Sequence, residues 1–249
     1  MRIQLEVTEK DIARVRSFFD QWVKSPMVVK RAERNVNGKR AQLTERTLWH
    51  AIVTCQLTTQ QRSGPQSPIT KLMRIEPFPL SLDTARAQRD VGRWATDVLS
   101  KHGGIRRYNQ LSDEIATNLQ NLDARDFAVL LRELRPLEKG TSKSAERDAA
   151  HLLDRLLAGV GPKQARNILQ SLGLSQFEIP LDSRVAKWLR GIGFPLPVAA
   201  AALSDSTYYD FALDAFQEMS QAVGVLPCLL DAAIFASFDR AWSEEEVVW

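Results

Sequence analysis

The chain has 249 residues, of which 44% are apolar and 25% charged, a composition typical of an ordinary soluble globular protein. It lacks an uncharged apolar run of about 18 residues, and the start MRIQLEVTEKDIARVRSFF lacks the apolar region of a signal peptide, so we expect a cytoplasmic protein. The two cysteines and three histidines lie far apart without metal-ligand spacing. We therefore expect neither a structural zinc nor an iron–sulfur cluster.

Charge is distributed unevenly along the chain. Residues 200–249 hold nine acidic residues against the single base Arg240, a net charge of −8. Because the whole chain carries +3, the other 199 residues carry +11. A body this basic favours a polyanionic partner, since lysines and arginines that neutralise phosphates release condensed counterions. A solvated basic surface without such a partner explains the charge equally well.

Helical periodicity dominates the sequence. Apolar residues recur at three- and four-residue steps in residues 11–23, 47–57, 123–135, 144–157 and 206–223. We predict N-caps at Asp123, at Ser144 and at either Asp205 or Ser206, and a short strand or extended arm only at the N-terminal MRIQLEV. Breaks rich in Gly, Pro, Asn and Ser lie at 35–40, 62–68, 75–81, 101–104, 137–143 and 193–197. The pattern predicts an all-α fold of about ten helices joined by short loops.

The stretch LLAGVGPKQARNIL, residues 156–169, predicts a helix-hairpin-helix. One helix ends near Leu157, Gly159, Val160 and Gly161 make the turn, and a second helix begins at Pro162. Such a turn directs free N–H groups and a positive helix end outward, an arrangement that binds phosphate. An ordinary turn between two packed helices uses the same residue types.

The segment after the hairpin brings an aspartate back towards it. A helix over residues 163–172 rises about 15 Å, Gly173 is expected to end it, and residues 174–181 span up to roughly 26 Å when extended. Asp182 can therefore return to the mouth of the hairpin beside Lys163. Two simpler interpretations stay open: Asp182 as the N-cap of the helix that begins DSRV, and Lys163 as a phosphate contact only.

These residues resemble a known family. LLAGVGPKQARNIL, followed 19 positions after its lysine by the aspartate of IPLDSRV, is similar to the helix-hairpin-helix, Gly/Pro-rich loop and aspartate of the HhH-GPD DNA glycosylases. Within that superfamily the chain resembles the lysine-bearing bifunctional branch, the 8-oxoguanine glycosylase and endonuclease III type, most strongly over residues 153–189. It lacks the C-terminal cysteine cluster of the endonuclease III branch, so the resemblance implies no cofactor.

The resemblance implies a base-excision DNA glycosylase with AP lyase activity. Its partner would be double-stranded DNA containing a damaged or modified base, and its substrate an oxidised purine such as 8-oxoguanine. Lys163, as a neutral amine, would attack C1′ and form a Schiff base, while Asp182 would stabilise the cationic sugar. Two alternatives stay open: a glycosylase for another lesion or a hypermodified base in foreign DNA, and a non-catalytic protein that uses the hairpin to bind DNA.

A weaker similarity covers residues 47–65, TLWHAIVTCQLTTQQRSGP. Here the family places a Gln or Asn that fills the gap left by the extruded base, and Gln56 falls at that place. The loop QQRSGPQSP, with Arg62 and Gly64, is expected to touch the minor groove or to be an ordinary exposed loop. The other predicted DNA contacts belong to the hairpin and to the helix after Asp182: Gly159, Val160, Gly161 and Arg184.

Other features are less specific. The stretch GGIRRYNQ, residues 103–110, is a candidate for a second side chain inserted into DNA. The aromatic residues Phe235, Phe238 and Trp242 either stack on the flipped base or pack in the core. The resemblance also implies two helical subdomains flanking a DNA-binding cleft, residues 1–45 with 165–249 and residues 46–164, the latter ending in the hairpin. We expect a monomer.

Overall fold

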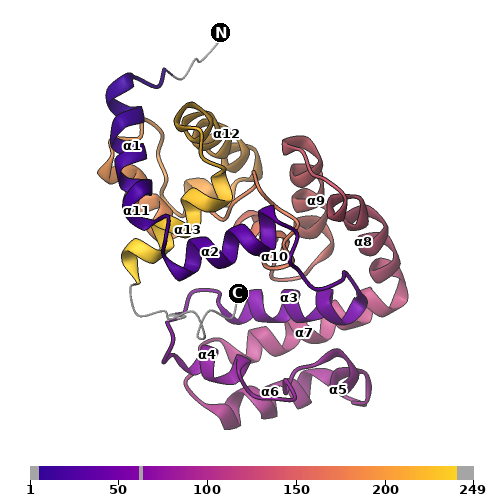
Figure 1. Cartoon of the computed structure of the whole chain (residues 1–249). Helices are drawn as coiled ribbons and strands as arrows, with labels where there is room; N and C mark the ends of the chain where they lie inside the picture. Colours follow the sequence, from indigo (N-terminus) through magenta and orange to yellow (C-terminus); the bar gives the residue numbers. More distant parts are fainter. Residues whose placement is uncertain (1–5, 62–63, 240–249) are drawn as a thin grey trace.

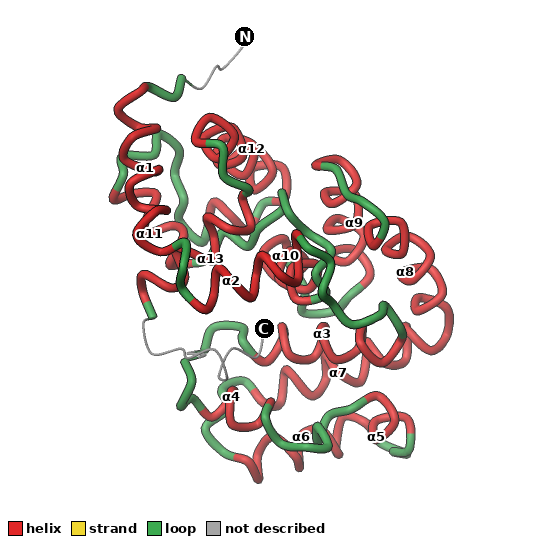
Figure 2. Tube along the Cα trace, viewed as in Figure 1, coloured by secondary structure: helices red, strands yellow, loops and turns green. Residues whose placement is uncertain are grey.

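The computed structural model describes residues 6–61 and 64–239, and every regular element in these two stretches is helical (Figures 1 and 2). This confirms the all-α prediction, although short helices after the predicted breaks raise the number of α-helices described to thirteen. In chain order the elements are α1 (Glu9–Trp22), α2 (Pro26–Arg31), η1 (Ala32–Val36), α3 (Glu45–Leu57), α4 (Pro68–Met73), α5 (Leu82–Arg86), α6 (Val91–His102), α7 (Tyr108–Asn121), η2 (Leu122–Asp126), α8 (Phe127–Leu134), η3 (Arg135–Glu138), α9 (Lys143–Leu156), α10 (Pro162–Ser171), α11 (Ser183–Gly191), η4 (Ala202–Ser204), α12 (Ser206–Val223) and α13 (Pro227–Phe238). Of residues 1–7, where the strand or arm was expected, residues 1–5 lie outside the described residues and residues 6 and 7 form no strand.

The predicted helix starts are partly right. Asp205 caps α12 through its side chain, as expected. Helix α9 begins two residues earlier than predicted, so Ser142 caps it and the prediction of Ser144 is wrong. The prediction of a cap at Asp123 is also wrong, because the π-helical turn η2 carries the chain from α7 into α8 without an end. Asp123 instead accepts a hydrogen bond from Arg86 Nε at 2.9 Å.

The buried apolar residues form two main clusters. The larger core takes its residues from Leu43 to Leu174, and the smaller core from α1, α2 and the residues Ile179 to Ile234. Figure 1 shows α1, α11, α12 and α13 on one side and α3 to α8 on the other. Helix α10 contributes Ala165, Ile168 and Leu169 to the larger core, so it packs with the residues that precede it, although the sequence placed the subdomain boundary at 165.

The return segment between α10 and α11 is fixed from both ends. Gly173 ends α10 with φ +73°, as the sequence predicted. The N–H groups of residues 176–178 all donate to the carboxylate of Glu146 on α9, at 2.8, 2.8 and 2.7 Å. Glu146 is fully buried, so this one side chain holds the return segment against α9.

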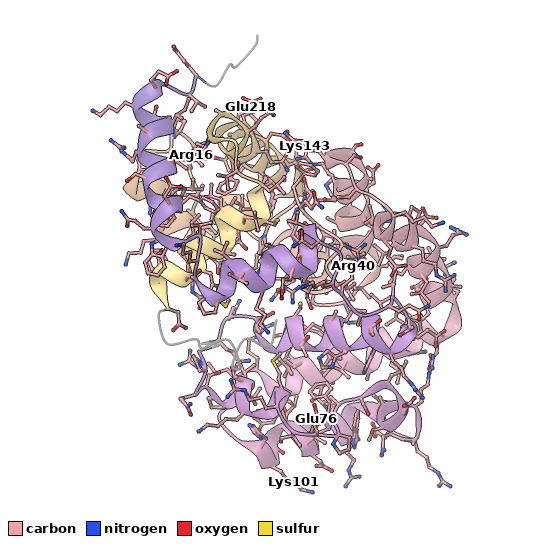
Figure 3. The ribbon with its side chains drawn as sticks, in the orientation of Figure 1. Arg16, Arg40, Glu76, Lys101, Lys143 and Glu218 are labelled. Carbon is pink, nitrogen blue, oxygen red and sulfur yellow. The ribbon has the colours of Figure 1, made fainter. Side chains whose placement is uncertain are left out.

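The chain crosses between the two cores twice, and the crossing segments lie side by side. Asn35 on the first crossing donates to the carbonyl of Ser175 on the second, at 2.8 Å. Arg40, which follows η1, donates to the carbonyl of Gly173 at 2.7 Å and also to that of Glu138 (Figure 3). The two crossings are therefore joined to each other and to the larger core.

Within the described ranges, no single helix is both long enough and apolar enough to cross a membrane. Helices α12 and α13 meet those two criteria only as a pair, which is bent by 95°, and their apolar residues form much of the smaller core.

Candidate active site

A cleft of about 970 Å³ lies between the two cores. Its walls come from α2 and η1, from the end of α3 and the segment after it, from one face of α10, from α11 and from α13. Lys163 and Asp182 both line it, together with Arg184. The structure thus brings to one cavity the amine and the carboxylate that the sequence analysis singled out.

Lys163 lies in the first turn of α10 and is half-buried in the wall of the cleft. Among the described residues its amine has neither a hydrogen-bond partner nor an ion-pair partner. Burial lowers the pKa of Lys163, while the nearby Asp182, Cys55 and Asp231 oppose the shift and Arg184 adds to it. The environment therefore favours the neutral amine, which is the nucleophilic form.

Asp182 is the N-cap of α11, so the simpler interpretation of this residue is confirmed. Its Oδ1 accepts the N–H groups of Arg184 and Val185 at 2.8 and 3.0 Å. Its Oδ2 accepts a hydrogen bond from the Arg184 guanidinium at 3.0 Å. Because the side chain is 18% exposed and lines the cleft, the capping role leaves the carboxylate accessible from the cavity.

The turn between α9 and α10 is held from outside by polar side chains. Asn118 on α7 accepts the N–H of Ala158 at 2.7 Å and donates to its carbonyl at 3.0 Å. Gly159 has φ +73°, and a Cβ there would lie only 2.2 Å from the carboxylate of Glu114. The turn needs glycine at this position for its backbone conformation and for the space that Glu114 occupies.

The same turn leaves backbone donors without partners. No side chain caps α10, and Pro162 at its first position has no N–H. In the described part of the chain, the N–H groups of Gly159, Gly161, Lys163 and Gln164 find no acceptor. Those of Lys163 and Gln164 are unpaired first-turn donors of the kind that make a helix N-terminus an anion site, and those of the two glycines lie just before them.

Two predicted DNA contacts of this region need correction. Gln56 is only 1% exposed, and its Nε2 donates to the carbonyl of Ala158 at 2.9 Å, so it holds the hairpin turn and does not project towards DNA. Val160 is 5% exposed, its side chain packs in the larger core, and its N–H donates to Leu157. Both are buried because the turn packs closely against the end of α3.

An exposed glutamine, Gln60, lies four positions after Gln56. Gln60 lines the cleft and has φ +56°, a conformation uncommon for a residue other than glycine. The neighbouring Gln61 accepts the N–H of Arg106 at 2.7 Å, which places the stretch 103–110 beside this turn. Of the loop residues predicted to contact DNA, Arg62 lies outside the described residues and Gly64 is half-buried without lining the cleft.

The inner wall of the cleft carries a polar group that sequence reasoning missed. Asp231 accepts hydrogen bonds from Arg31 and Gln170, each at 3.0 Å. Burial raises the pKa of Asp231, against the effect of Arg31, and burial also lowers the pKa of Arg34 to about 9. The available signal was Asp231 itself, the one charged residue of α13 in the apolar run PCLLDAAIFASF.

The candidate aromatic residues differ in their surroundings. Phe235 lines the cleft, and the Arg184 guanidinium lies 4.2 Å from its ring centroid. Phe238 is 40% exposed with Lys187 at 5.3 Å, and it does not line the cleft. Trp242 lies outside the described residues. Phe235 is therefore the aromatic side chain of the three that is placed to face a ligand.

No protein-family model matches the sequence, and no curated protein is significantly similar to it. Solved structures do resemble the chain in three dimensions, among them two 8-oxoguanine DNA glycosylases. The 8-oxoguanine DNA glycosylase of Thermotoga maritima aligns with a TM-score of 0.67 and 18% identity over 91% of this chain and 96% of that one. The 8-oxoguanine DNA glycosylase of Methanocaldococcus jannaschii aligns with a TM-score of 0.65 and 16% identity over 91% of this chain and 92% of that one. The protein has the helical fold of these two structures.

Proposed function

We propose that the protein is a DNA glycosylase with AP lyase activity that removes a damaged base, an oxidised purine of the 8-oxoguanine type, from double-stranded DNA. The observation that carries the proposal is the convergence of the Lys163 amine and the Asp182 carboxylate on one cleft, beside a turn with unpaired N–H groups. The fold shared with two structures described as 8-oxoguanine DNA glycosylases supports it.

Lys163 is the proposed nucleophile because burial favours its neutral form. The amine adds to C1′ of the damaged nucleotide and displaces the base, which leaves with the proton that the amine gives up. The nitrogen lone pair then forms the C=N bond as the C1′–O4′ bond breaks, and O4′ takes a proton from solvent, which gives the protonated Schiff base. Loss of a C2′ proton expels the 3′ phosphate and nicks the strand, and water finally releases the lysine.

Asp182 is the proposed electrostatic partner of this step. Positive charge develops at C1′ as the glycosidic bond breaks, and a fixed carboxylate beside it lowers the barrier. The two N–H groups of α11 and the Arg184 guanidinium hold both Asp182 oxygens in place, so the carboxylate needs no reorganisation during the reaction.

The hairpin turn is the proposed contact to the DNA backbone. The free N–H groups of Gly159 and Gly161 and of the first turn of α10 suit a phosphate oxygen. The basic part of the chain, which carries +11 outside residues 200–249, adds the long-range attraction that duplex DNA requires.

The remaining space suits a flipped nucleotide. Ligand cavities range from about 300 to 1,000 Å³, and the cleft of about 970 Å³ reaches the top of that range. Its inner wall presents Asp231 and Arg34 for hydrogen bonds and the Phe235 ring for stacking. A base of the guanine type has both the polar edges and the flat face that such walls bind.

Borohydride trapping tests the proposal. Wild-type protein is incubated with duplexes containing 8-oxoguanine, other oxidised or modified bases or an abasic site, and the Schiff base is reduced to a stable covalent adduct. We expect an adduct and strand nicking with wild type, and neither with Lys163→Ala. Lys101→Ala, at an exposed position on α6 away from the cleft, is the matched control and should behave as wild type (Figure 3).

The outcomes separate the possible functions. An adduct that forms only with a different damaged base would support a glycosylase of another specificity. Duplex binding without excision or adduct on any substrate would contradict the proposed enzyme and favour a non-catalytic DNA-binding protein. An adduct that persists in Lys163→Ala would exclude Lys163 as the nucleophile.

A further inference from the structure

Arg166 is a fully buried arginine on the far side of α10 from solvent. Its Nε donates to Glu178 at 2.8 Å and its Nη2 to Asp210 at 2.6 Å. Its Nη1 donates to the carbonyl of Pro162 at 3.1 Å, the residue immediately before Lys163. The guanidinium therefore contacts the turn from which the proposed nucleophile projects.

Tyr209 on α12 is also fully buried, and the Cζ atom of Arg166 lies over its ring, 4.5 Å from the ring centroid. Its hydroxyl donates to the carbonyl of Ile179 at 3.0 Å and accepts the N–H of Leu181 at 2.6 Å. Leu181 immediately precedes Asp182. The tyrosine thus fixes the peptide groups that deliver the proposed electrostatic partner to the cleft.

We propose that Arg166 and Tyr209 are positioning residues that set the separation of Lys163 and Asp182 across the cleft. This inference rests on the proposed glycosylase function. One stacked pair connects the residue before the amine to the residue before the carboxylate, and it does so between α10 of the larger core and α12 of the smaller core. The relative placement of the two groups depends on this pair because they lie on elements of different cores.

A purely stabilising role explains the arrangement less well. Replacing a buried ion pair with well-packed apolar residues is often neutral or stabilising, so such a pair is weak evidence for stability and is better suited to fixing geometry. Arg147 adds a second guanidinium to Glu178 at 3.0 Å and lies 3.9 Å from Asp210, so both carboxylates around Arg166 have a further cationic partner. Reacting groups tolerate little error, since a displacement of about 1 Å can cost about a hundredfold in rate.

The test compares three single hydroxyl deletions. Tyr209→Phe removes the contacts to Ile179 and Leu181 but keeps the ring under Arg166. Ser220→Ala removes another fully buried hydroxyl of α12, whose bond to the carbonyl of Val225 at 2.8 Å lies away from the cleft. Tyr208→Phe removes the neighbouring tyrosine hydroxyl, bonded to Pro197 at 2.8 Å.

For each variant we would measure the single-turnover excision rate, the Kd for a duplex with a non-cleavable abasic analogue, and the pH profile of adduct formation. We expect Tyr209→Phe to lose at least about tenfold in rate with a Kd within about twofold of wild type. Its pH profile should also shift to lower pH, because displacing Asp182 weakens the attraction that raises the pKa of Lys163. The other groups that act on Lys163, those of Cys55, Asp231 and Arg184, stay in place.

Thermal unfolding of every variant supplies the control for stability. Arg166→Lys, which keeps the charge but cannot reach Glu178 and Pro162 together, is the second variant and should reduce the rate in the same way. An active wild type whose rate and pH profile are unchanged in both variants overturns the positioning role. So does a rate loss that Ser220→Ala reproduces at equal loss of Tm. A wild type that neither excises nor forms an adduct refutes the proposed function itself.

Discussion

The carboxylate of Asp182 accepts two hydrogen bonds from Arg184, one from its N–H at 2.8 Å and one from its guanidinium at 3.0 Å. The same guanidinium lies 4.2 Å from the ring centroid of Phe235 in the wall of the cleft. Arg184, two positions after Asp182, therefore orients the carboxylate and is itself held by its contact with Phe235 of α13. The proposed electrostatic partner has a fixed orientation in the protein before DNA binds.

Replacing this carboxylate with an amide should separate capping from catalysis. Asparagine caps helices about as well as aspartate, so Asp182→Asn should keep Tm and duplex binding nearly unchanged. Excision should fall about a hundredfold or more in single-turnover assays, because the charge beside C1′ is lost. Asp205→Asn makes the same change at the cap of α12, away from the cleft, and should leave excision intact. Unchanged excision in Asp182→Asn would refute its catalytic role.

Removing the amine should stabilise the protein. The pKa of Lys163 is lower in the folded than in the unfolded chain, so the folded state binds fewer protons and its stability rises as pH climbs from the folded pKa to the ordinary lysine value. Near neutral pH the buried ammonium is a cost that Lys163→Met removes. We expect a Tm higher by a few degrees, since 1 kcal/mol corresponds to about 2–4 °C in a chain of this size.

Scanning calorimetry at neutral pH and at a pH near the ordinary lysine pKa measures this effect. The gain should shrink at the higher pH, because the folded wild type loses the Lys163 proton before the unfolded chain does. Lys101→Met, at an exposed position, should change Tm little at either pH. A lower Tm for Lys163→Met at neutral pH would show that the amine stabilises the fold and would contradict the lowered pKa of Lys163.

The glycine of the hairpin turn should be replaceable only at a cost to both stability and DNA binding. Gly159→Ala forces an alanine into φ +73°, a conformation that costs roughly 1–2 kcal/mol, and sets its Cβ against Glu114. Gly38→Ala meets the same φ strain at +71° with open space around it. Urea unfolding should show a larger loss for Gly159→Ala, and only that variant should weaken duplex binding. Equal losses in the two variants would exclude the contact with Glu114 as a factor.

Two glutamines four positions apart should respond in opposite ways. Gln56→Ala removes a buried hydrogen bond to the hairpin and should lower the free energy of unfolding by about 1–2 kcal/mol. Gln60→Ala should leave stability unchanged and slow excision, because its exposed side chain at the cleft can fill the gap left by a flipped base. Denaturant unfolding and stopped-flow fluorescence of a base analogue opposite the lesion measure the two effects. If Gln56→Ala is stable and slows excision, Gln56 and not Gln60 fills the gap.

Local signals in the sequence predicted the parts of the site that depend on neighbouring residues. Gly173 ends α10, Asp205 and Asp182 cap their helices, and the extended return segment brings Asp182 to the cleft that Lys163 lines. Each of these features follows from backbone geometry over a few residues, such as positive φ at a glycine or an acceptor for first-turn N–H groups.

The features that depend on distant packing were not predictable. Gln56 and Gln60 are the same residue type near one helix end, and only the contact with the hairpin buries the first. Arg166 reads as a charged residue on an amphipathic helix, yet it is fully buried because Glu178 and Asp210 arrive from other segments. Asp123 has the sequence of a cap, but a π-helical turn lets the helix continue through it.

Asn35 and Arg40 join the two segments that connect the cores, and this joining affects how far the protein can open around a ligand. Because the two connections between the cores are hydrogen-bonded to each other, we expect the cleft to resist opening. Under the proposed function, a bound duplex would then have to bend and extrude a nucleotide. The DNA would then be deformed and the protein would not, and the free energy of that deformation is smallest where stacking or pairing is already impaired. Under the proposed function, a rigid protein would therefore bind preferentially where the double helix is already weakened, before it makes any contact with the base itself.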